Sequence, residues 1–162
     1  MLARLLLASA AALLLLLSGC ASVPMGDPKQ DAINKTFATK PTAAGVYIYR
    51  NESFGAAIRM DVLADGVPVG QSAAKTYFYL DVPPGKHTFT SKSENDDSVT
   101  LDLVAGKLYY IWQEVKMGLL YARTKLVPMP EDEGKKGVLE CQLALPNSSY
   151  RPATVSRLSK DE

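Results

Sequence analysis

The sequence predicts an all-β fold, a single β-sandwich of about seven short antiparallel strands followed by a short C-terminal helix, within residues 43–145. Several segments alternate apolar and polar residues with a period of two, which is typical of strands that bury one face. Turn-forming residues separate these segments at intervals of roughly 8–12 residues. The segments are also rich in β-branched and aromatic residues, which favour strands. A small open barrel is the alternative arrangement of the same strands.

The first strands surround a strong hairpin signal. Residues 46–50 are aromatic and β-branched, and residues 58–64 alternate apolar and polar side chains. Asp65-Gly66 follows at once and leads into a short return strand at residues 67–70. An Asp-Gly pair between apolar runs favours a type I′ turn, in which both central residues have positive φ. We therefore expect a tight hairpin here.

The remaining strands follow from the same alternation. Their expected ranges are 76–82, 87–92, 99–103, 108–115 and 120–126. Pro83-Pro84-Gly85 is expected to form one of the turns between them, and the polar residues 93–97 another. Pro128 and Pro130 are expected to end the sheet.

A short helix is expected near the end of the domain. Acidic residues 131–133 precede Val138, Leu139 and Cys141, and acidic side chains stabilise the positive end of a helix. Gly134 and Gly137 oppose this prediction, because each costs about 1 kcal/mol in a helix interior. Residues 146–162 are polar and aperiodic, and we expect them to form a disordered tail.

The first 19 residues have the pattern of a cleaved signal peptide. Arg4 supplies the positive start, and residues 5–17 form an apolar run of 13 residues. A membrane-spanning helix needs about 20 apolar residues, so an uncleaved anchor helix is the weaker alternative. The run ends in Leu17-Ser18-Gly19-Cys20. This sequence resembles the lipobox of bacterial lipoproteins, in which the cysteine becomes the mature N-terminus.

The lipobox resemblance implies a covalent lipid on Cys20 and cleavage after Gly19. The thiol would take a diacylglyceryl group and the new amino group an acyl chain, and two or three such chains anchor a protein stably. Ala21 follows the cysteine instead of Asp, which in similar lipoproteins of Gram-negative bacteria favours export to the outer membrane. We therefore expect a protein held to the outer membrane by lipid and facing the periplasm. Residues 20–42 are expected to be its tether, with one helical turn near 31–37.

The charge balance excludes some classes of partner. The chain of 162 residues has 18 Lys and Arg against 17 Asp and Glu, and residues 20–162 are formally neutral because Arg4 precedes them. A nucleic-acid-binding protein needs a basic surface, so we expect no such partner. If Cys20 carries lipid, Cys141 has no partner within the chain. A buried, inert thiol is the favoured interpretation, with an intermolecular bridge or a reactive thiol as alternatives.

The order of these strand and turn motifs resembles one known family. The motifs are Val46-Tyr47-Ile48-Tyr49-Arg50, Asp65-Gly66 with Val69-Gly70, Tyr77-Phe78 before Pro84-Gly85-Lys86-His87, and Gly106 with Tyr109-Tyr110. Together they are similar to the bacterial lipoprotein family built on domain of unknown function 2846, over about residues 43–145. The resemblance implies a transthyretin-like or PEGA-like β-sandwich and no assigned activity.

Residues suited to catalysis or metal binding are few. His87 is the only histidine, and a hydrolase would have to combine it with a hydroxyl such as Ser91 or Ser93. No nucleophile elbow is present, so we expect an ordinary strand residue and no catalytic site. Residues 94–97 are acidic enough to attract Ca²⁺ but lack the glycine and the distal glutamate of a calcium loop. We expect a solvated loop there, with no metal and no cofactor beyond the lipid.

The strand aromatics are the best candidates for an interaction surface. Tyr77 and Tyr79 alternate with Phe78 and Leu80, so they are expected to be partly exposed if the Phe78 face is the core. Together with Trp112 they could contact a protein or a sugar. The alternative is that they form cross-strand pairs or contacts for the terminal helix.

These observations predict a lipid-anchored, non-enzymatic envelope protein. Its sandwich would act as a binding or assembly module for an envelope protein. The alternatives are a module that binds glycan or peptidoglycan, and less favourably a hydrolase of the cell wall that uses His87.

Overall fold

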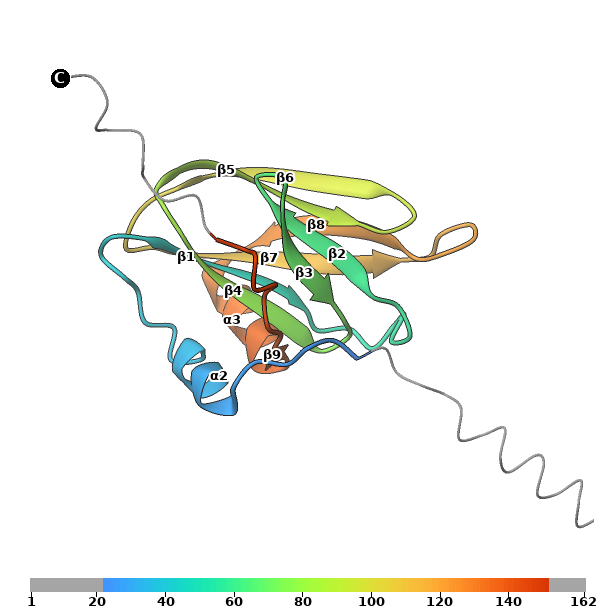
Figure 1. Ribbon diagram of the computed structural model, residues 1–162, viewed down its shortest axis with the longest axis horizontal. Coiled ribbons are helices and arrows are strands. Elements are labelled where there is room, and N and C mark those ends of the chain that lie inside the picture. The colour runs from blue at the N-terminus through green and yellow to red at the C-terminus, as the bar shows by residue number, and fades with distance from the viewer. Residues whose placement is uncertain (1–21, 152–162) are drawn as a thin grey trace, which may run out of the picture.

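The computed structural model describes residues 22–151, and in this range it is a two-layer β-sandwich with two short helices (Figure 1). The five-stranded sheet has the order β8-β7-β1-β4-β9. Its strands are β1 (Ala44–Arg50), β4 (Thr76–Val82), β7 (Leu108–Lys116), β8 (Arg123–Met129) and β9 (Gln142–Leu143). The four-stranded sheet has the order β3-β2-β5-β6. Its strands are β2 (Met60–Ala64), β3 (Val67–Ser72), β5 (Gly85–Lys92) and β6 (Asp96–Leu103). The predicted all-β sandwich with a C-terminal helix is confirmed.

The core lies between the two sheets and follows the predicted alternation. Phe78 and Leu80 of β4 are buried against Val62 of β2 and Phe89 of β5 in one apolar cluster. Asp65 and Gly66 have φ angles of 51° and 77°, so the turn between β2 and β3 has the two positive φ values that the Asp-Gly pair predicted.

The strand pairing differs from the prediction in two places. Within residues 22–151 the chain forms nine strands, and β1 pairs parallel with β7 while β4 pairs parallel with β9. The prediction of an entirely antiparallel arrangement is therefore wrong. A parallel pair joins strands that are distant in the sequence, so no turn motif marks it.

The last expected strand also needs correction. A strand was expected at residues 120–126, but β8 begins only at Arg123, and Leu120 lies in the loop before it and is exposed. Pro128 was expected to end the sheet, but it lies inside β8 and pairs with Ile111. Proline is tolerated here because β8 is an edge strand, whose outer side needs no N–H donor.

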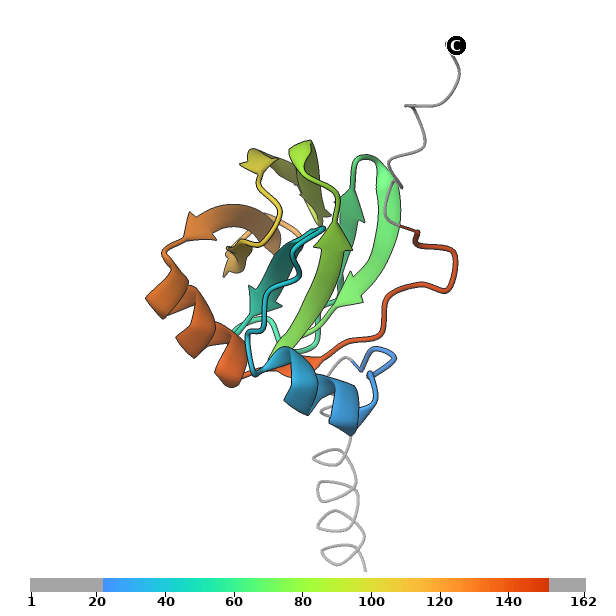
Figure 2. The ribbon, with the colours of Figure 1, turned by 90° about the vertical axis from the view of Figure 1, so that its left-hand side faces the viewer.

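Two helices cover the outer face of the five-stranded sheet, as Figure 2 shows. Helix α3 (Glu131–Leu139) occupies the predicted position, and Gly134 and Gly137 are buried against the sheet. A Cβ atom on Gly137 would lie 2.1 Å from Cε2 of Tyr49, so the glycines allow the helix to pack closely. Helix α2 (Pro28–Asn34) lies in the segment expected to be a tether.

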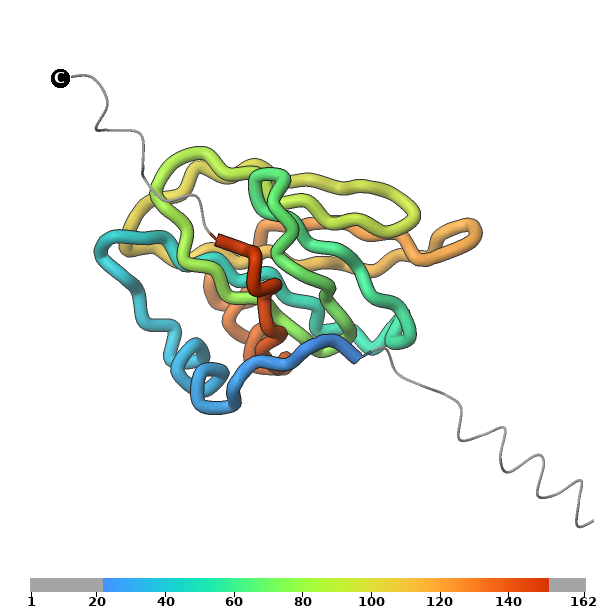
Figure 3. The backbone as a smooth tube through the Cα atoms, viewed as in Figure 1, coloured from blue at the N-terminus to red at the C-terminus, as the bar shows by residue number. Residues whose placement is uncertain are grey.

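The prediction of a tether is wrong for the residues that the structure describes. Asp27 caps α2 by accepting a hydrogen bond from the N–H of Lys29, and Pro28 follows in the first turn, where its missing N–H costs nothing. Val23 is buried in the core cluster, and Met25 pairs with Ala144, so the two ends of the domain run side by side (Figure 3). The lipobox and Ala21 lie outside the described residues.

The start of the predicted tail also packs on the domain. The N–H of Asn147 donates to the carbonyl of Val69 at 2.7 Å, and Tyr150 packs against the core cluster. The prediction of disorder is therefore wrong for residues 146–151. The rest of the predicted tail lies outside the described residues.

Candidate functional site

A hollow of about 610 Å³ between α2 and the outer face of the five-stranded sheet is the leading candidate for a binding site, and we call it the α2 groove. Its polar and aromatic lining comes from α2, the segment after it and the sheet. These lining residues are Gln30, Asn34, Thr39, Lys40, Tyr47, Tyr79 and Asp81. Leu143, Leu145 and Pro146 close it on the C-terminal side. Ligand pockets are typically about 300–1,000 Å³ and largely apolar with a few placed polar groups, so this hollow has a suitable size.

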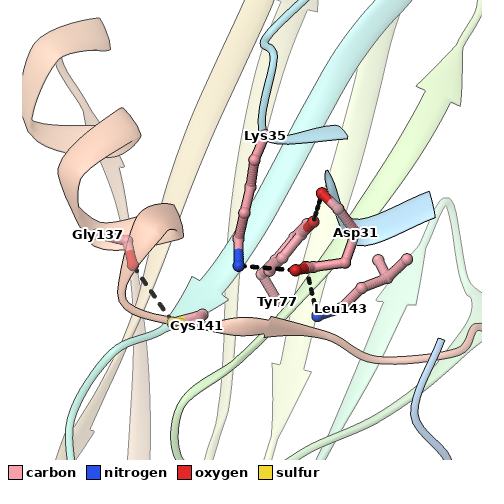
Figure 4. Close-up of polar contacts among 6 residues, drawn as sticks. All are labelled: Asp31, Lys35, Tyr77, Gly137, Cys141 and Leu143. Atoms are coloured by element: carbon pink, nitrogen blue, oxygen red, sulfur yellow. Dashed lines mark hydrogen bonds and ion pairs between the residues drawn. The ribbon is translucent and has the colours of Figure 1, made fainter. Parts of the chain in front are cut away.

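Asp31 connects helix α2 to the rest of the domain (Figure 4). Its Oδ1 accepts a hydrogen bond from the N–H of Leu143 at 3.0 Å, and its Oδ2 pairs with Lys35 Nζ at 2.8 Å. The backbone carbonyl of Asp31 accepts a hydrogen bond from the hydroxyl of Tyr77 at 3.5 Å. One side chain thus connects α2 to β9, and its backbone connects the helix to β4.

A row of tyrosines from three adjacent strands lies beneath α2, and two of them, Tyr47 and Tyr79, form the floor of the groove. Tyr47 of β1 stands opposite Tyr79 of β4 and beside Tyr110 of β7 in the strand register. The rings of Tyr47 and Tyr110 are stacked with centroids 5.2 Å apart, and those of Tyr47 and Tyr79 are tilted at 4.8 Å. Phe37 packs on Tyr47 from the end of α2 at 5.5 Å. Such contacts add to the area that aromatic rings bury and hold the floor rigid.

Hydrogen bonds order the polar rim of the groove. Oδ1 of Asp81 accepts a hydrogen bond from the hydroxyl of Tyr79 at 2.8 Å, and Oδ2 accepts one from Lys40 Nζ at 2.5 Å. Across the groove, Gln30 Nε2 donates to Asn34 Oδ1 at 2.8 Å, and the hydroxyl of Tyr47 donates to the carbonyl of Asn34 at 2.7 Å. The rim therefore offers a carboxylate, an ammonium and an amide, each with capacity for a further hydrogen bond.

Burial keeps the tyrosines of this layer protonated. It raises the pKa of Tyr47, Tyr79 and Tyr110 well above the ordinary value, and for Tyr79 the hydrogen bond to Asp81 adds to the effect. The hydroxyls of Tyr47 and Tyr79 already donate within the protein, so toward a ligand they can act as acceptors, and as neutral groups they cannot serve as bases near neutral pH. The groove is chemically suited to binding.

The predicted interaction surface has to be revised residue by residue. Tyr77 is 0% exposed, so the expectation that it faces solvent is wrong. Tyr79 is half-buried and lines the groove, and Trp112 is half-buried against the tyrosine layer. The inference from alternation failed because α2, α3 and β9 cover the face opposite Phe78. The alternative of cross-strand pairs and helix contacts describes Tyr77 correctly.

The other cysteine and the histidine have structural partners. Cys141 is a free, buried thiol whose Sγ donates to the carbonyl of Gly137 at 3.3 Å, and burial raises its pKa to about 12. His87 Nδ1 lies 2.6 Å from Asp65 Oδ2, and Oδ1 of Asp65 accepts the N–H of Thr88 at 2.8 Å. Ser91, the suggested hydroxyl partner, is hydrogen-bonded to Thr124 instead.

The acidic loop is exposed at Glu94 and Asp96, as expected of a solvated loop, and its side chains also form hydrogen bonds to the neighbouring chain. Glu94 accepts hydrogen bonds from the N–H groups of three consecutive residues, 119–121, at 2.7–3.0 Å. The side-chain amide of Asn95 donates to the carbonyl of Thr124 and accepts from its N–H group. Asp97 Oδ2 accepts a hydrogen bond from the N–H of Leu126 at 2.6 Å. These side chains join the two sheets. Among residues 22–151, no group of three His, Cys, Asp or Glu side chains lies close enough to hold a metal ion.

The groove was missed because residues 20–42 were interpreted as a tether. Asp27-Pro28 is an N-cap and first-turn pair, and it was the signal in the sequence that could have located α2. Neither helix in the described range is long and apolar enough to cross a bilayer.

The chain resembles known proteins of undetermined role. A family model described as "Protein of unknown function (DUF2846)" matches residues 40–124, which include Lys40, Tyr79 and Asp81 but not α2. An uncharacterized protein of Haemophilus influenzae is 33% identical over 133 residues, which cover 81% of this chain and 79% of the relative. No solved structure matches the chain. The chain therefore belongs to the DUF2846 family of proteins of unknown function.

Proposed function

We propose that this protein is a lipid-anchored, non-catalytic binding module of the cell envelope, attached through Cys20 to the outer membrane and facing the periplasm. The Leu17-Ser18-Gly19-Cys20 sequence supports the anchor. The observation that carries the binding role is the α2 groove, whose floor is aromatic and whose rim groups are held by hydrogen bonds. A site ordered before the ligand arrives loses less entropy on binding.

The aromatic floor and the polar rim, with its carboxylate, ammonium and amide groups, favour a glycan as the ligand over a protein segment. Tyrosine presents a flat apolar ring and a hydroxyl, and a sugar presents apolar C–H faces and hydroxyl groups. Tyr79 contributes its ring to the floor, and its hydroxyl donates a hydrogen bond to Asp81, which can accept further hydrogen bonds from a sugar. A protein partner is the alternative occupant of the groove.

Calorimetric titration of the detergent-solubilised, full-length protein with soluble peptidoglycan fragments tests the ligand. We expect binding, and a loss of at least about tenfold in affinity for Asp81→Asn, since one charged hydrogen bond contributes roughly 1.5–3 kcal/mol. The matched control is Asp102→Asn, an exposed carboxylate on β6 in the other sheet. Binding that is absent, or equally strong in both variants, would contradict a glycan site in the groove.

A separate experiment tests the anchor. Cells fed a palmitate analogue should label the wild-type protein and leave Cys20→Ser unlabelled, and only the labelled form should sediment with outer membranes. An unlabelled wild-type protein that retains Met1 in mass spectrometry would contradict the proposal.

A further inference from the structure

The loop between β7 and β8 exposes a continuous run of large apolar side chains. We call residues 117–121 the apolar finger. Met117 is 80% exposed, Leu119 90%, Leu120 93% and Tyr121 50%. Phe54, which is also half exposed, lies in the loop between β1 and β2 and lines a shallow hollow together with these residues. Soluble surfaces rarely place several large apolar residues together, so such a patch marks a contact with an apolar partner.

The finger has a defined shape. The three N–H groups of residues 119–121 all donate to the carboxylate of Glu94, which lowers the pKa of that group. Gly118 is required for the turn, because a Cβ atom there would lie 1.8 Å from the carbonyl oxygen of Tyr121. Three backbone donors of the tip are thus satisfied within the protein, which lowers the cost of moving the tip into an apolar medium.

The finger lies at the end of the sandwich where the described chain begins. Ser22 and Val23 line a hollow with Ala73 and Thr76, the residues just before and at the start of β4. Tyr77 at that end of β4 is level with Tyr49 of β1 and Trp112 of β7. β7 continues four residues past Trp112, or about 13 Å. Figure 1 shows the loop between β7 and β8 projecting from the right-hand end of the molecule.

The position of Val23 limits the distance between this end and the membrane. Val23 is buried in the core, and it follows Cys20 by three positions. An extended chain spans at most about 3.5 Å per residue, so a lipid on Cys20 would hold this end of the domain within about 10 Å of the bilayer. That distance is similar to the length of about 13 Å by which β7 extends past Trp112 toward the finger. A protein anchored in this way therefore could not keep the finger far from its own membrane.

We propose that the apolar finger inserts into the interfacial region of the bilayer that holds the lipid on Cys20. This inference rests on the proposed lipid anchor. Side chains of this kind enter the boundary between headgroups and acyl chains, to a depth of about 5–10 Å. Tyr121 suits that boundary because its ring is apolar and its hydroxyl is polar. Glu94 stays near the headgroups, because a carboxylate is costly to bury more deeply.

Spin-label accessibility on the full-length, acylated protein tests this insertion. The protein is reconstituted into vesicles of phosphatidylethanolamine and phosphatidylglycerol, with a nitroxide on Leu120→Cys. Leu120 is solvent-exposed, so this change does not disturb the core, and Cys141 is buried and does not compete for the label. The matched control is a label on Lys86→Cys. This exposed position lies at the start of β5, and Glu94, which binds the finger, follows the other end of that strand.

We expect the label at position 120 to collide several-fold more with oxygen, relative to a water-soluble nickel complex, than the label at position 86. Equal accessibility at the two positions, with the lipid on Cys20 confirmed by mass spectrometry, overturns the insertion and leaves the anchor intact. A label at position 120 that is shielded in native envelopes but not in vesicles identifies a protein contact, which also overturns insertion. A Cys20 without lipid overturns the anchor and the insertion together.

Discussion

The outer faces of the two sheets differ in what covers them. In the five-stranded sheet, all seven residues of β1 are buried, because α2 and α3 cover the side that faces away from the core. In the four-stranded sheet, β6 alternates between exposed and half-buried residues over most of its length. Its outer face carries polar pairs, such as Thr88 with Thr100 and Thr90 with Ser98, each at 2.8 Å.

The comparison shows that the same alternating pattern can have two structural meanings. A period of two indicates that the two faces of a strand differ, but it does not show that one of them is exposed to solvent. The covered face carries aromatic residues and the bare face carries Thr and Ser. The α2 groove lies on the covered face because a site of this kind needs a second layer to form its wall.

Substitution of one residue on each outer face tests the comparison most strongly. Tyr77→Ala should lower the free energy of unfolding by about 3–5 kcal/mol, as expected for a large aromatic side chain removed from a packed layer. Thr100→Ala on the bare face should change it by no more than about 0.5 kcal/mol. Urea unfolding followed by Trp112 fluorescence measures both, and similar losses would show that the covered face is not a second core.

A substitution in helix α3 tests how closely the helix packs on the covered face. Gly137→Ala should lower the free energy of unfolding by about 1–3 kcal/mol, because the new methyl group would overlap the ring of Tyr49. The higher helix propensity of alanine, worth about 1 kcal/mol, offsets only part of this loss. The control is Lys136→Ala, an exposed position on the same helix. A Gly137→Ala protein as stable as the control would mean that α3 does not pack tightly on the sheet.

Alkaline pH should destabilise the covered face selectively. Burial raises the pKa of Cys141 to about 12 and that of Tyr49 to about 12. Because the folded protein holds these protons more tightly than the unfolded chain, the stabilisation is complete below about pH 8.5 and is lost as pH rises to about 12. Each group lowers the free energy of unfolding by at most about 1.4 kcal/mol per pH unit in this window.

Urea midpoints measured from pH 8 to 11 test this dependence, with Cys141→Ala as the comparison. The variant should show a shallower decline than the wild type, because one of the titrating groups has been removed. A midpoint that stays constant over this range would indicate that the thiol and the tyrosines are solvated.

Local sequence signals predicted the elements that short-range physics controls. The Asp65-Gly66 hairpin, the inward side chains of β4 and helix α3 all occur where they were expected. Each depends on a turn geometry, an alternation or a charge pattern within a few residues. The α2 groove was not predicted, because it needs Tyr47, Tyr79 and Asn34 from three separate segments. Neither was the role of Glu94, which depends on a loop 25 residues away.

By itself, the sequence determined the all-β class, the family, the positions of most strands and the motif that suggests a lipid anchor. The tertiary structure alone decided that β1 lies beside β7, that α2 packs on the sheet and that Tyr77 is buried. The physical reason is that alternation and turn residues act through neighbouring positions. Coverage of a sheet face depends on which distant segment packs against it, and no local pattern encodes that choice.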